Sequence, residues 1–488
     1  MSALLVGAAF AQQALASGYH FGTQSVSAQG TANASGAAAE DASTIFYNPA
    51  GLTLVKGTTV SGVLDLVVPH TEFRDGGSHT SGVINTATGQ TLIPGRATGG
   101  SNGGDFVKTT AVPHAYFSHQ LNDTTTVGLG VFVPFGSMTE YNDDWVGRYN
   151  IIKTELKTVA INPSFAFKAS EMVSVGGGIT AQYIHGKLIK GADFGSGAVG
   201  LLLQQGAISA ATANALLNVA GVAGNPKYSG QVDIKGDDWA FGWNLGVMFN
   251  IDPATRIGVA YRSKIKHELQ GDAVWTVPQT FAAAGSPFGP AGALVQGSLN
   301  ARYSNSAATL NVDTPESLSI SAFKQINDKV ALMADVTRTR HSRFEELRVD
   351  FANGLADSNT PERWDDTTKV SVGGTYQLND TIKLRGGLSY DQSPVDDSNR
   401  TPSIPDNNRK WISLGANWAV SKDSSFDFAY SFVQVGKPKV NIFDNGGQTT
   451  ASGAATCNQA ANTSSCATLI GEYKVYSHIL GLQYNHRF

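Results

Sequence analysis

The side chains that could carry out catalysis or bind a metal ion are few and scattered. Ten histidines occur in 488 residues, and none has the spacing to other ligands that a zinc site requires. His114 and His119 lie in one expected strand and its turn, without a visible partner set. No G-x-S-x-G nucleophile elbow and no phosphate-binding loop occurs. We therefore predict no catalytic residue, no metal site and no cofactor.

The two cysteines, Cys457 and Cys466, lie in a stretch rich in Ser, Thr, Asn and Gly. Two cysteines are too few for a disulfide scaffold. An exported chain nevertheless meets an oxidising compartment. The pair is therefore predicted to form a disulfide that closes a loop, rather than to do chemistry.

The chemistry that the sequence favours is the binding of apolar molecules. Residues 194–226 and 273–301 contain no charged side chain and are rich in large apolar ones. Contiguous exposed apolar patches mark interaction sites, so these segments are predicted to form a hydrophobic loop groove, with a short helix over 208–219. They could also pack on each other as a lid, and the two interpretations are compatible. The groove candidates are Leu201, Leu202, Leu203, Ile208, Leu216, Leu217, Trp275, Phe281 and Phe288.

Composition limits the scaffold that can carry these loops. Charged residues make up 15% of the chain, against a usual ~25%. No run of 18 apolar residues occurs, so no transmembrane helix is expected. The net charge of −4 is spread along the chain, which gives no indication of nucleic-acid binding. A large soluble all-β protein and a bacterial outer-membrane β-barrel remain.

Residues alternate in polarity along most of the chain, as in 381–391, where apolar and charged side chains occupy opposite faces. Short Asn/Asp turns alternate with long connections, the loop pattern of bacterial barrels. The chain is therefore predicted to be all-β, a 14-stranded antiparallel transmembrane β-barrel over 57–488. The expected strands are 57–68, 109–120, 123–136, 150–169, 171–190, 229–250, 255–273, 306–325, 329–350, 363–378, 381–390, 409–420, 424–440 and 470–488.

The residues before the first strand do not alternate. Residues 1–16 resemble a signal peptide with an A-x-A cleavage site, and the absence of a basic n-region suggests truncation at its start. Residues 17–56 are mostly small and polar. Because small residues pack closely inside a lumen and Asn48-Pro49-Ala50 forms a fixed turn, this segment is predicted to be an N-terminal hatch. The alternative is a disordered periplasmic tail.

The last strand alternates up to Phe488. A C-terminal aromatic residue that closes an alternating strand resembles the sorting signal of outer-membrane barrels. This predicts export through the periplasm, insertion by the barrel assembly machinery and a location in the bacterial outer membrane.

Several sequence blocks resemble the long-chain fatty acid transporters of the outer membrane (the FadL/TodX type). AEDASTIFYNPAGL, residues 39–52, is similar to their N-terminal hatch. The blocks that begin at Asp237, Ala260 and Asp391 match later parts of the family in the same order. The resemblance covers more than 450 residues and implies a plugged fourteen-stranded barrel. Substrate would be caught on extracellular loops, enter an inner pocket and leave sideways through a kink in the third strand.

The resemblance also assigns roles to single residues. Gly136 matches the kink glycine, next to Phe135 and Pro134, although an ordinary turn at a strand end remains open. Tyr19 and Phe21 resemble the N-terminal aromatic residues that enter the pocket. Lys190 aligns with the basic residue that holds the fatty-acid carboxylate, and an ordinary solvated lysine is the alternative.

The match to the carboxylate site is incomplete. Lys187 lies near Lys190 in sequence, but the family's second basic residue falls at Thr360, and Arg363 is the nearest substitute. This leaves two substrate classes: long-chain fatty acids, or aromatic and other neutral hydrocarbons. A general diffusion porin is the alternative from another class, and it would carry charged rings at a constriction and no plug. The transporter is predicted to be passive and monomeric, surrounded by outer-membrane lipid and lipopolysaccharide.

Overall fold

The protein was analysed as a computed structural model that describes residues 18–80, 83–84, 91–93, 95–445, 448–451 and 467–488. The segment expected to be a signal peptide, 1–16, lies outside these residues. So does the expected disulfide between Cys457 and Cys466.

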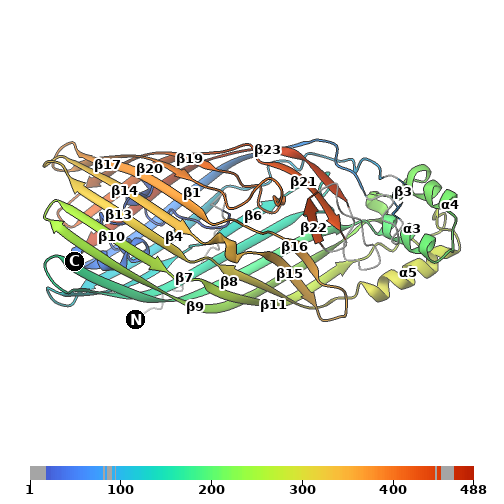
Figure 1. Ribbon diagram of the computed structural model, residues 1–488, viewed down its shortest axis with the longest axis horizontal. Helices are drawn as coiled ribbons and strands as arrows, with labels where there is room; N and C mark the ends of the chain where they lie inside the picture. Colours follow the sequence, from blue (N-terminus) through green and yellow to red (C-terminus); the bar gives the residue numbers. More distant parts are fainter. Residues whose placement is uncertain (1–17, 81–82, 85–90, 94, 446–447, 452–466) are drawn as a thin grey trace.

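The described chain forms a closed, 14-stranded antiparallel β-barrel, as predicted (Figure 1). The first strand closes the wall by pairing with the last, from Thr59↔Arg487 to Asp75↔Gly471. Several wall strands consist of two consecutive segments. The wall segments are β1 (Thr58–Asp75), β4 (Thr110–Gln120), β5 (Thr125–Phe132), β6 (Gly136–Glu140), β7 (Lys153–Lys168), β8 (Val173–Ala192), β9 (Gly230–Asp252), β10 (Thr255–Arg262), β11 (Ile265–Thr276), β12 (Ser306–Thr314), β13 (Ser317–Gln325), β14 (Val330–Thr339), β15 (Glu346–Phe351), β16 (Ser358–Pro361), β17 (Thr367–Gln377), β18 (Ile382–Asp391), β19 (Arg409–Ala419), β20 (Ser424–Val435), β21 (Lys439–Asn445) and β23 (Thr468–Arg487).

The loops and turns segregate by length between the two ends of the barrel. The helices of the long loops gather at one end, and tight turns close the other (Figure 1). The loop helices are α3 (Phe194–Gln204), α4 (Ala210–Asn214) with a π-helical turn (Ala215–Val219), and α5 (Ala291–Arg302). The helix expected over 208–219 thus corresponds to α4 and its extension, whereas α3 and α5 were not expected. Three short strands, β2 (Val83–Ile84), β3 (Thr91–Ile93) and β22 (Gln448–Ala451), also belong to loops. None of the helices in the described ranges is long and apolar enough to cross a membrane.

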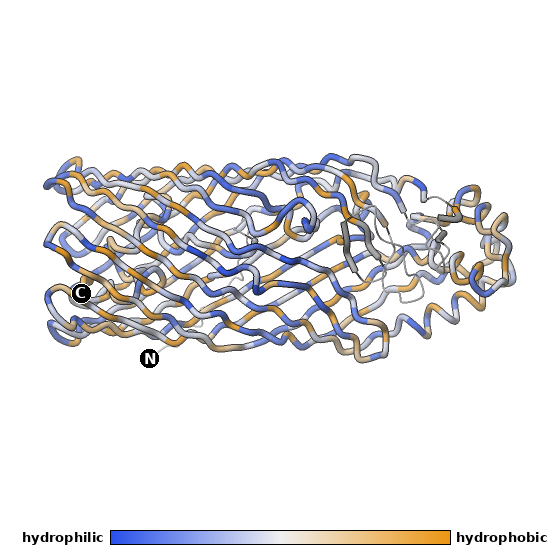
Figure 2. The backbone as a smooth tube through the Cα atoms, in the orientation of Figure 1, coloured by the Kyte–Doolittle hydropathy of each residue, from blue (hydrophilic) through white to orange (hydrophobic). Residues whose placement is uncertain are grey.

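The outer surface of the barrel carries large apolar side chains at every second residue. On β9, the exposed fractions of Trp239, Phe241, Trp243 and Leu245 are 53, 73, 46 and 55%. Soluble proteins bury such residues, whereas a lipid-facing strand exposes them. Figure 2 shows the resulting mixture of hydrophobic and hydrophilic positions along the strands.

Residues 18–56 lie against the inner faces of the wall strands. They include three short helices, α1 (Val26–Gln29), α2 (Thr44–Tyr47) and a 3-10 turn (Pro49–Leu54). Val26 N donates to Gln483 Oε1 at 2.8 Å, Asn48 Nδ2 donates to Val247 O at 3.1 Å, and Arg256 Nε donates to Ala37 O at 2.9 Å. Because β23 lies far along the chain from the consecutive strands β9 and β10, these bonds hold the segment to two separate parts of the wall.

Glycines in the wall make room for the Asn48-Pro49-Ala50 turn. A Cβ atom added to Gly246 would lie 2.0 Å from Asn48 Oδ1, and one added to Gly176 would lie 2.6 Å from Ala50 N. These two glycines pair with each other across β8 and β9. The turn therefore depends on a shallow depression that only glycine leaves in the wall.

We expect Gly246→Ala to lower the free energy of unfolding by about 1–3 kcal/mol, because overpacking displaces the Asn48 side chain. Gly62→Ala is the matched control, since an added Cβ there meets no atom within 4 Å. The measurement is urea-induced unfolding of both variants in lipid vesicles. Equal stability of the two variants would contradict the role given to this depression.

Candidate ligand-binding cavities and the gap in the wall

The third wall strand is broken at residues 133–135. The ladder between β4 and β5 ends at Ala115↔Val131, and β5 also pairs with β7. β6 pairs with β7 along 136–140, and within the described residues no register joins its other edge to β4. Pro134 has no N–H to donate to a ladder. At the next residue, the Phe135 N–H donates to Thr158 Oγ1 at 3.0 Å, and the Thr158 hydroxyl donates to Phe135 O at 2.6 Å. The break includes Pro134 and Phe135, two of the three residues at which a kink was expected, and the third, Gly136, begins β6.

The N-terminal residues run along this break. Phe21 N donates to Pro134 O at 2.9 Å, and Gly136 N donates to Tyr19 O at 2.8 Å. His20 and Phe135 form an isolated antiparallel bridge. The start of the described chain thus acts as a short extra strand on the inner side of the gap.

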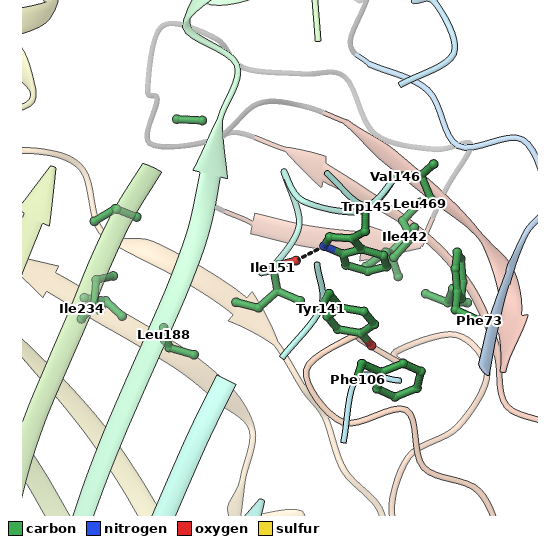
Figure 3. Close-up of a cluster of buried hydrophobic side chains, with 14 of the residues drawn as sticks. Phe73, Phe106, Tyr141, Trp145, Val146, Ile151, Leu188, Ile234, Ile442 and Leu469 are labelled. Atoms are coloured by element: carbon green, nitrogen blue, oxygen red, sulfur yellow. Dashed lines mark hydrogen bonds between the residues drawn. The ribbon is translucent and has the colours of Figure 1, made fainter. Parts of the chain in front are cut away.

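An aromatic stack lies near the gap, on the side of the long loops. The rings of Tyr141 and Trp145 are 3.8 Å apart and almost parallel, and Phe106 stacks on Tyr141 at 4.6 Å. Trp145 Nε1 donates to Ile151 O at 2.7 Å (Figure 3). The stack fixes Ile151, which lines the cavity described next.

An outer cavity lies inside the barrel near the end that carries the long loops. Its walls are mainly apolar, and Lys190 and Thr360 both line it. The Trp275 indole also lines it, and its Nε1–H has no hydrogen-bond partner among the residues that the structure describes. The apolar lining comprises Ile151, Leu188, Val232, Ile234, Trp275, Leu347, Val349, Phe351, Pro402 and Ile442.

The other two basic candidates lie elsewhere. Lys187 is on the opposite face of β8 from Leu188 and Lys190, and its ammonium lies 3.0 Å from Asp233 Oδ2. Arg363 is exposed and lies in the break between β16 and β17, with φ of 45°. Its N–H donates to Glu345 O at 2.9 Å. Neither residue lines the outer cavity.

An inner cavity lies directly inside the break. Phe21, Pro134 and Phe135 line it on the side of the gap. Hydroxyl side chains of β13, β14 and β17 line it from the wall, together with Lys369 and Trp411. Sequence reasoning did not select Lys369, Trp411 or His341, although the alternation of β17 places Lys369 on its inward face.

The two N-terminal aromatic residues occupy different surroundings. Tyr19 packs against Phe135, Phe344 and Trp364 at ring distances of 5.8, 5.5 and 5.2 Å, and its hydroxyl donates to Asp313 O at 2.7 Å. Phe21 lines the inner cavity and stacks on His114 at 6.1 Å. Both side chains are buried.

The apolar loop residues pack mainly on one another. Leu202, Leu216, Leu217, Phe281 and Phe288 are all buried in one cluster that also contains Trp275. Leu203 and Ile208 are half-buried against this cluster, and Leu201 is half-buried. Because Trp275 also lines the outer cavity, the loop cluster adjoins that cavity. The large apolar loop residues that remain exposed in the described chain include Val219 and Leu294.

A buried carboxylate fastens the first of these loops. Asp193 caps α3 by accepting from Ser196 N at 3.1 Å, and it also accepts from Gly224 N at 3.0 Å. Burial raises the pKa of Asp193, and the hydrogen bonds from Ser196 and Gly224 oppose this rise. The local Asp-x-x-Ser spacing was a helix-cap signal that the sequence reasoning missed.

Within the described residues, no three or more His, Cys, Asp or Glu side chains are grouped so as to hold a metal ion.

Comparisons with known proteins agree with this architecture. The chain is 38% identical over 494 residues to the protein NMB0088 of Neisseria meningitidis serogroup B, covering 99% of this chain and 98% of that one. It is 30% identical over 450 residues to the long-chain fatty acid transport protein of Escherichia coli, covering 90 and 93% of the two chains.

Solved structures show the same fold. The crystal structure of a Pseudomonas aeruginosa FadL homologue matches with a TM-score of 0.78 and 21% identity, covering 96% of this chain and all of that one. The Pseudomonas putida toluene transporter TodX matches with a TM-score of 0.59 and 18% identity, covering 92 and 94%. The family described as outer membrane protein transport protein (OMPP1/FadL/TodX) matches residues 7–488. The chain therefore belongs to this family of outer-membrane transport proteins.

Proposed function

We propose that this protein transports hydrophobic monocarboxylates, above all long-chain fatty acids, passively across the outer membrane. The observation that carries the proposal is the outer cavity, whose mainly apolar lining includes one basic side chain, that of Lys190. Each buried methylene of an acyl chain contributes ~0.8 kcal/mol. A charge-assisted contact with Lys190 adds about 1.5–3 kcal/mol and orients the carboxylate. The relative in Escherichia coli, a long-chain fatty acid transport protein, supports the same substrate.

Neutral aromatic hydrocarbons are the second candidate substrate. Thr360, a neutral residue, lines the outer cavity at the position where the resemblance would place a second cation. A cavity with one cation favours an acidic ligand over a neutral one less strongly than a cavity with two cations does. The Pseudomonas putida toluene transporter shares the fold.

The proposed route follows the described cavities. Ligand is caught at the surface of the loop cluster, passes Trp275 into the outer cavity and reaches the inner cavity beside the break. Residues 17–56 act as the hatch and block a straight path to the periplasm. Ligand leaves sideways between β4 and β6, where the gap is lined by Pro134, Phe135 and Gly136.

The surroundings of the barrel follow from its surface. The apolar outer face of β9 suits the acyl chains of outer-membrane lipid, with lipopolysaccharide around the extracellular half. We propose a monomer inserted by the barrel assembly machinery, and we assign transport and no reaction to this chain. A general diffusion porin would conduct ions readily, whereas a barrel filled by residues 18–56 is expected to conduct almost none.

We expect cells that lack their own transporter to take up labelled oleate when they express this protein, and Lys190→Ala to weaken saturable uptake at low oleate. A loss of about 1.5–3 kcal/mol in binding corresponds to a ten- to hundredfold higher half-saturating concentration. Lys187→Ala is the matched control on the same strand, because Lys187 pairs with Asp233 outside the cavity. Labelled toluene is offered in parallel.

The outcomes separate the two substrates. Toluene uptake that is indifferent to Lys190→Ala, without oleate uptake, would replace the fatty-acid proposal with the hydrocarbon one. Uptake of neither compound, with high ion conductance, would indicate a porin.

A further inference from the structure

The inner cavity has one polar and one apolar wall. Its polar wall carries the hydroxyl groups of Ser317, Ser319 and Thr337 on β13 and β14, with Ser319 and Thr337 joined at 2.8 Å. Its apolar wall is formed by Phe46 of the N-terminal segment and by Phe135 at the break. A cavity with this division fits an amphipathic molecule better than a uniformly apolar one.

A cation stands at the polar wall. Lys369 extends from β17, and its ammonium lies 4.9 Å from the centre of the Trp411 ring. Among the residues that the structure describes, no carboxylate oxygen lies within ion-pair distance of Lys369 Nζ. A largely enclosed ammonium without such a partner is costly, and an anionic ligand would remove that cost.

Further polar groups facing this cavity lack partners. Within the part of the chain that the structure describes, the Trp411 Nε1–H and both ring nitrogens of the fully buried His341 form no hydrogen bond. The two carboxylates that line the cavity are already engaged, because Asp335 accepts from Gly36 N at 3.4 Å and Asp391 lies 3.8 Å from Arg409 Nη1. Lys369, Trp411 and His341 are therefore donors available to a ligand. The Arg262 guanidinium also lines the cavity, and it already donates to Phe46 O at 3.0 Å.

We propose that the inner cavity is a second binding site for a carboxylate-headed amphiphile, held by Lys369 and Trp411. The carboxylate accepts from the Lys369 ammonium and the Trp411 indole N–H, and the acyl chain lies along Phe46 and Phe135 towards the gap. This inference deepens the proposed function and rests on it.

The outer cavity supports this assignment by its own composition. It too is lined by one lysine, Lys190, and by one indole N–H, that of Trp275, for which the described residues supply no acceptor. Each cavity is thus lined by one lysine and one indole, a set of side chains that suits one carboxylate. Thr360 supplies no second cation in the outer cavity. Lys369 instead supplies a cation in the inner cavity.

The test counts bound ligands on the purified protein by native mass spectrometry in detergent, with oleate and with oleyl alcohol as the neutral probe. We expect two oleate molecules on the wild type. Lys369→Met is expected to weaken the binding of one oleate molecule about tenfold, and Lys190→Met is expected to weaken the binding of the other. Lys369→Met should not change the binding of oleyl alcohol. Lys187→Met is the control and keeps both. Lys369→Arg retains the positive charge and is expected to bind both oleate molecules. Circular dichroism shows whether Lys369→Met is folded, and Lys369→Arg still tests the role of the charge if it is not.

Three results would overturn the inference. One bound oleate that is lost in Lys190→Met and kept in Lys369→Met leaves the proposed function intact and removes the second site. If Lys369→Met weakens the binding of oleate and of oleyl alcohol equally, the lysine does not contact the carboxylate head group. Absence of oleate binding by the wild type removes both the site and the proposed function.

Discussion

Oxidation of a cysteine pair at positions 20 and 135 is expected to reduce oleate uptake to the level of cells without the protein. His20 and Phe135 are partners in an isolated antiparallel bridge. The Cα atoms of such partners lie about 4.5–5.5 Å apart, within the range that a disulfide spans. The bond would fix the N-terminal segment on the inner side of the gap. If ligand leaves between β4 and β6, this segment must move aside first.

The experiment uses His20→Cys with Phe135→Cys in a chain whose Cys457 and Cys466 are replaced by Ser. Uptake is measured in the same cells before and after addition of a membrane-impermeant reductant. We expect the reduced protein to transport, which shows that loss of the two native side chains is tolerated. The oxidised protein is expected to be inactive and to recover on reduction.

A second cysteine pair controls for the effect of a disulfide as such. His79 and Ala97 form another isolated antiparallel bridge, away from the break. Oxidation of His79→Cys with Ala97→Cys is expected to leave uptake unchanged. Undiminished uptake by the oxidised pair at 20 and 135 would show that transport does not require the N-terminal segment to leave the gap.

Most of the barrel wall could be predicted from the sequence because strands and tight turns are each specified by residues close together in the chain. A strand between lipid and lumen alternates in polarity, and the tight turns carry their own hydrogen-bonding side chains. At the turn before β18, Asn379 Oδ1 accepts from the backbone N–H groups of both Thr381 and Ile382 at 3.0 Å. Such a turn is specified by a few adjacent residues, so its place could be predicted without knowledge of the rest of the barrel.

The cavities depend on distant parts of the chain, and there sequence reasoning failed in identifiable ways. Arg363 was a plausible substitute for Thr360 because it is only three residues away. The backbone turns at Arg363, and its N–H is held by Glu345 O. Lys369 reaches a cavity only because β17 lies near Trp411 of β19 and the N-terminal segment, and no local pattern reports that arrangement. The alternation of β17 is consistent with an inward-facing Lys369, but it contains no information on which groups meet the lysine there.

Replacing Arg385 by methionine is expected to cause the largest loss of stability of any single substitution considered. The Arg385 guanidinium is buried between Glu40 of the N-terminal segment, at 2.6 Å, and Asp427 of β20, at 2.5 Å. Removing one partner of a buried ionic group leaves the others without compensation, which costs about 3–5 kcal/mol. Because Glu40 belongs to the segment inside the barrel, the loss should also loosen that segment and raise ion conductance in planar bilayers.

The matched control is Arg74→Met, since Arg74 is 70% exposed and lies 3.6 Å from Glu72 and 3.7 Å from Glu472. An exposed pair contributes about 0–1 kcal/mol, so urea-induced unfolding of this variant should resemble that of the wild type. A similarly small loss in Arg385→Met would contradict the role assigned to the buried group.

A triple variant distinguishes the cost of unpaired charge from the loss of attraction. Arg385→Met combined with Glu40→Gln and Asp427→Asn removes Arg385 and both of its carboxylate partners, and leaves Lys383, which lies 3.1 Å from Glu40 in the wild type. If most of the loss in Arg385→Met comes from the buried Asp427 carboxylate left without its cation, the triple variant should regain most of it. Asn417 Nδ2 and Asn485 Nδ2 can still bond to the side-chain oxygen at position 427, which they contact at 2.9 and 2.7 Å. Recovery of stability together with high conductance would mean that the ionic group holds the N-terminal segment in place more than it stabilises the wall.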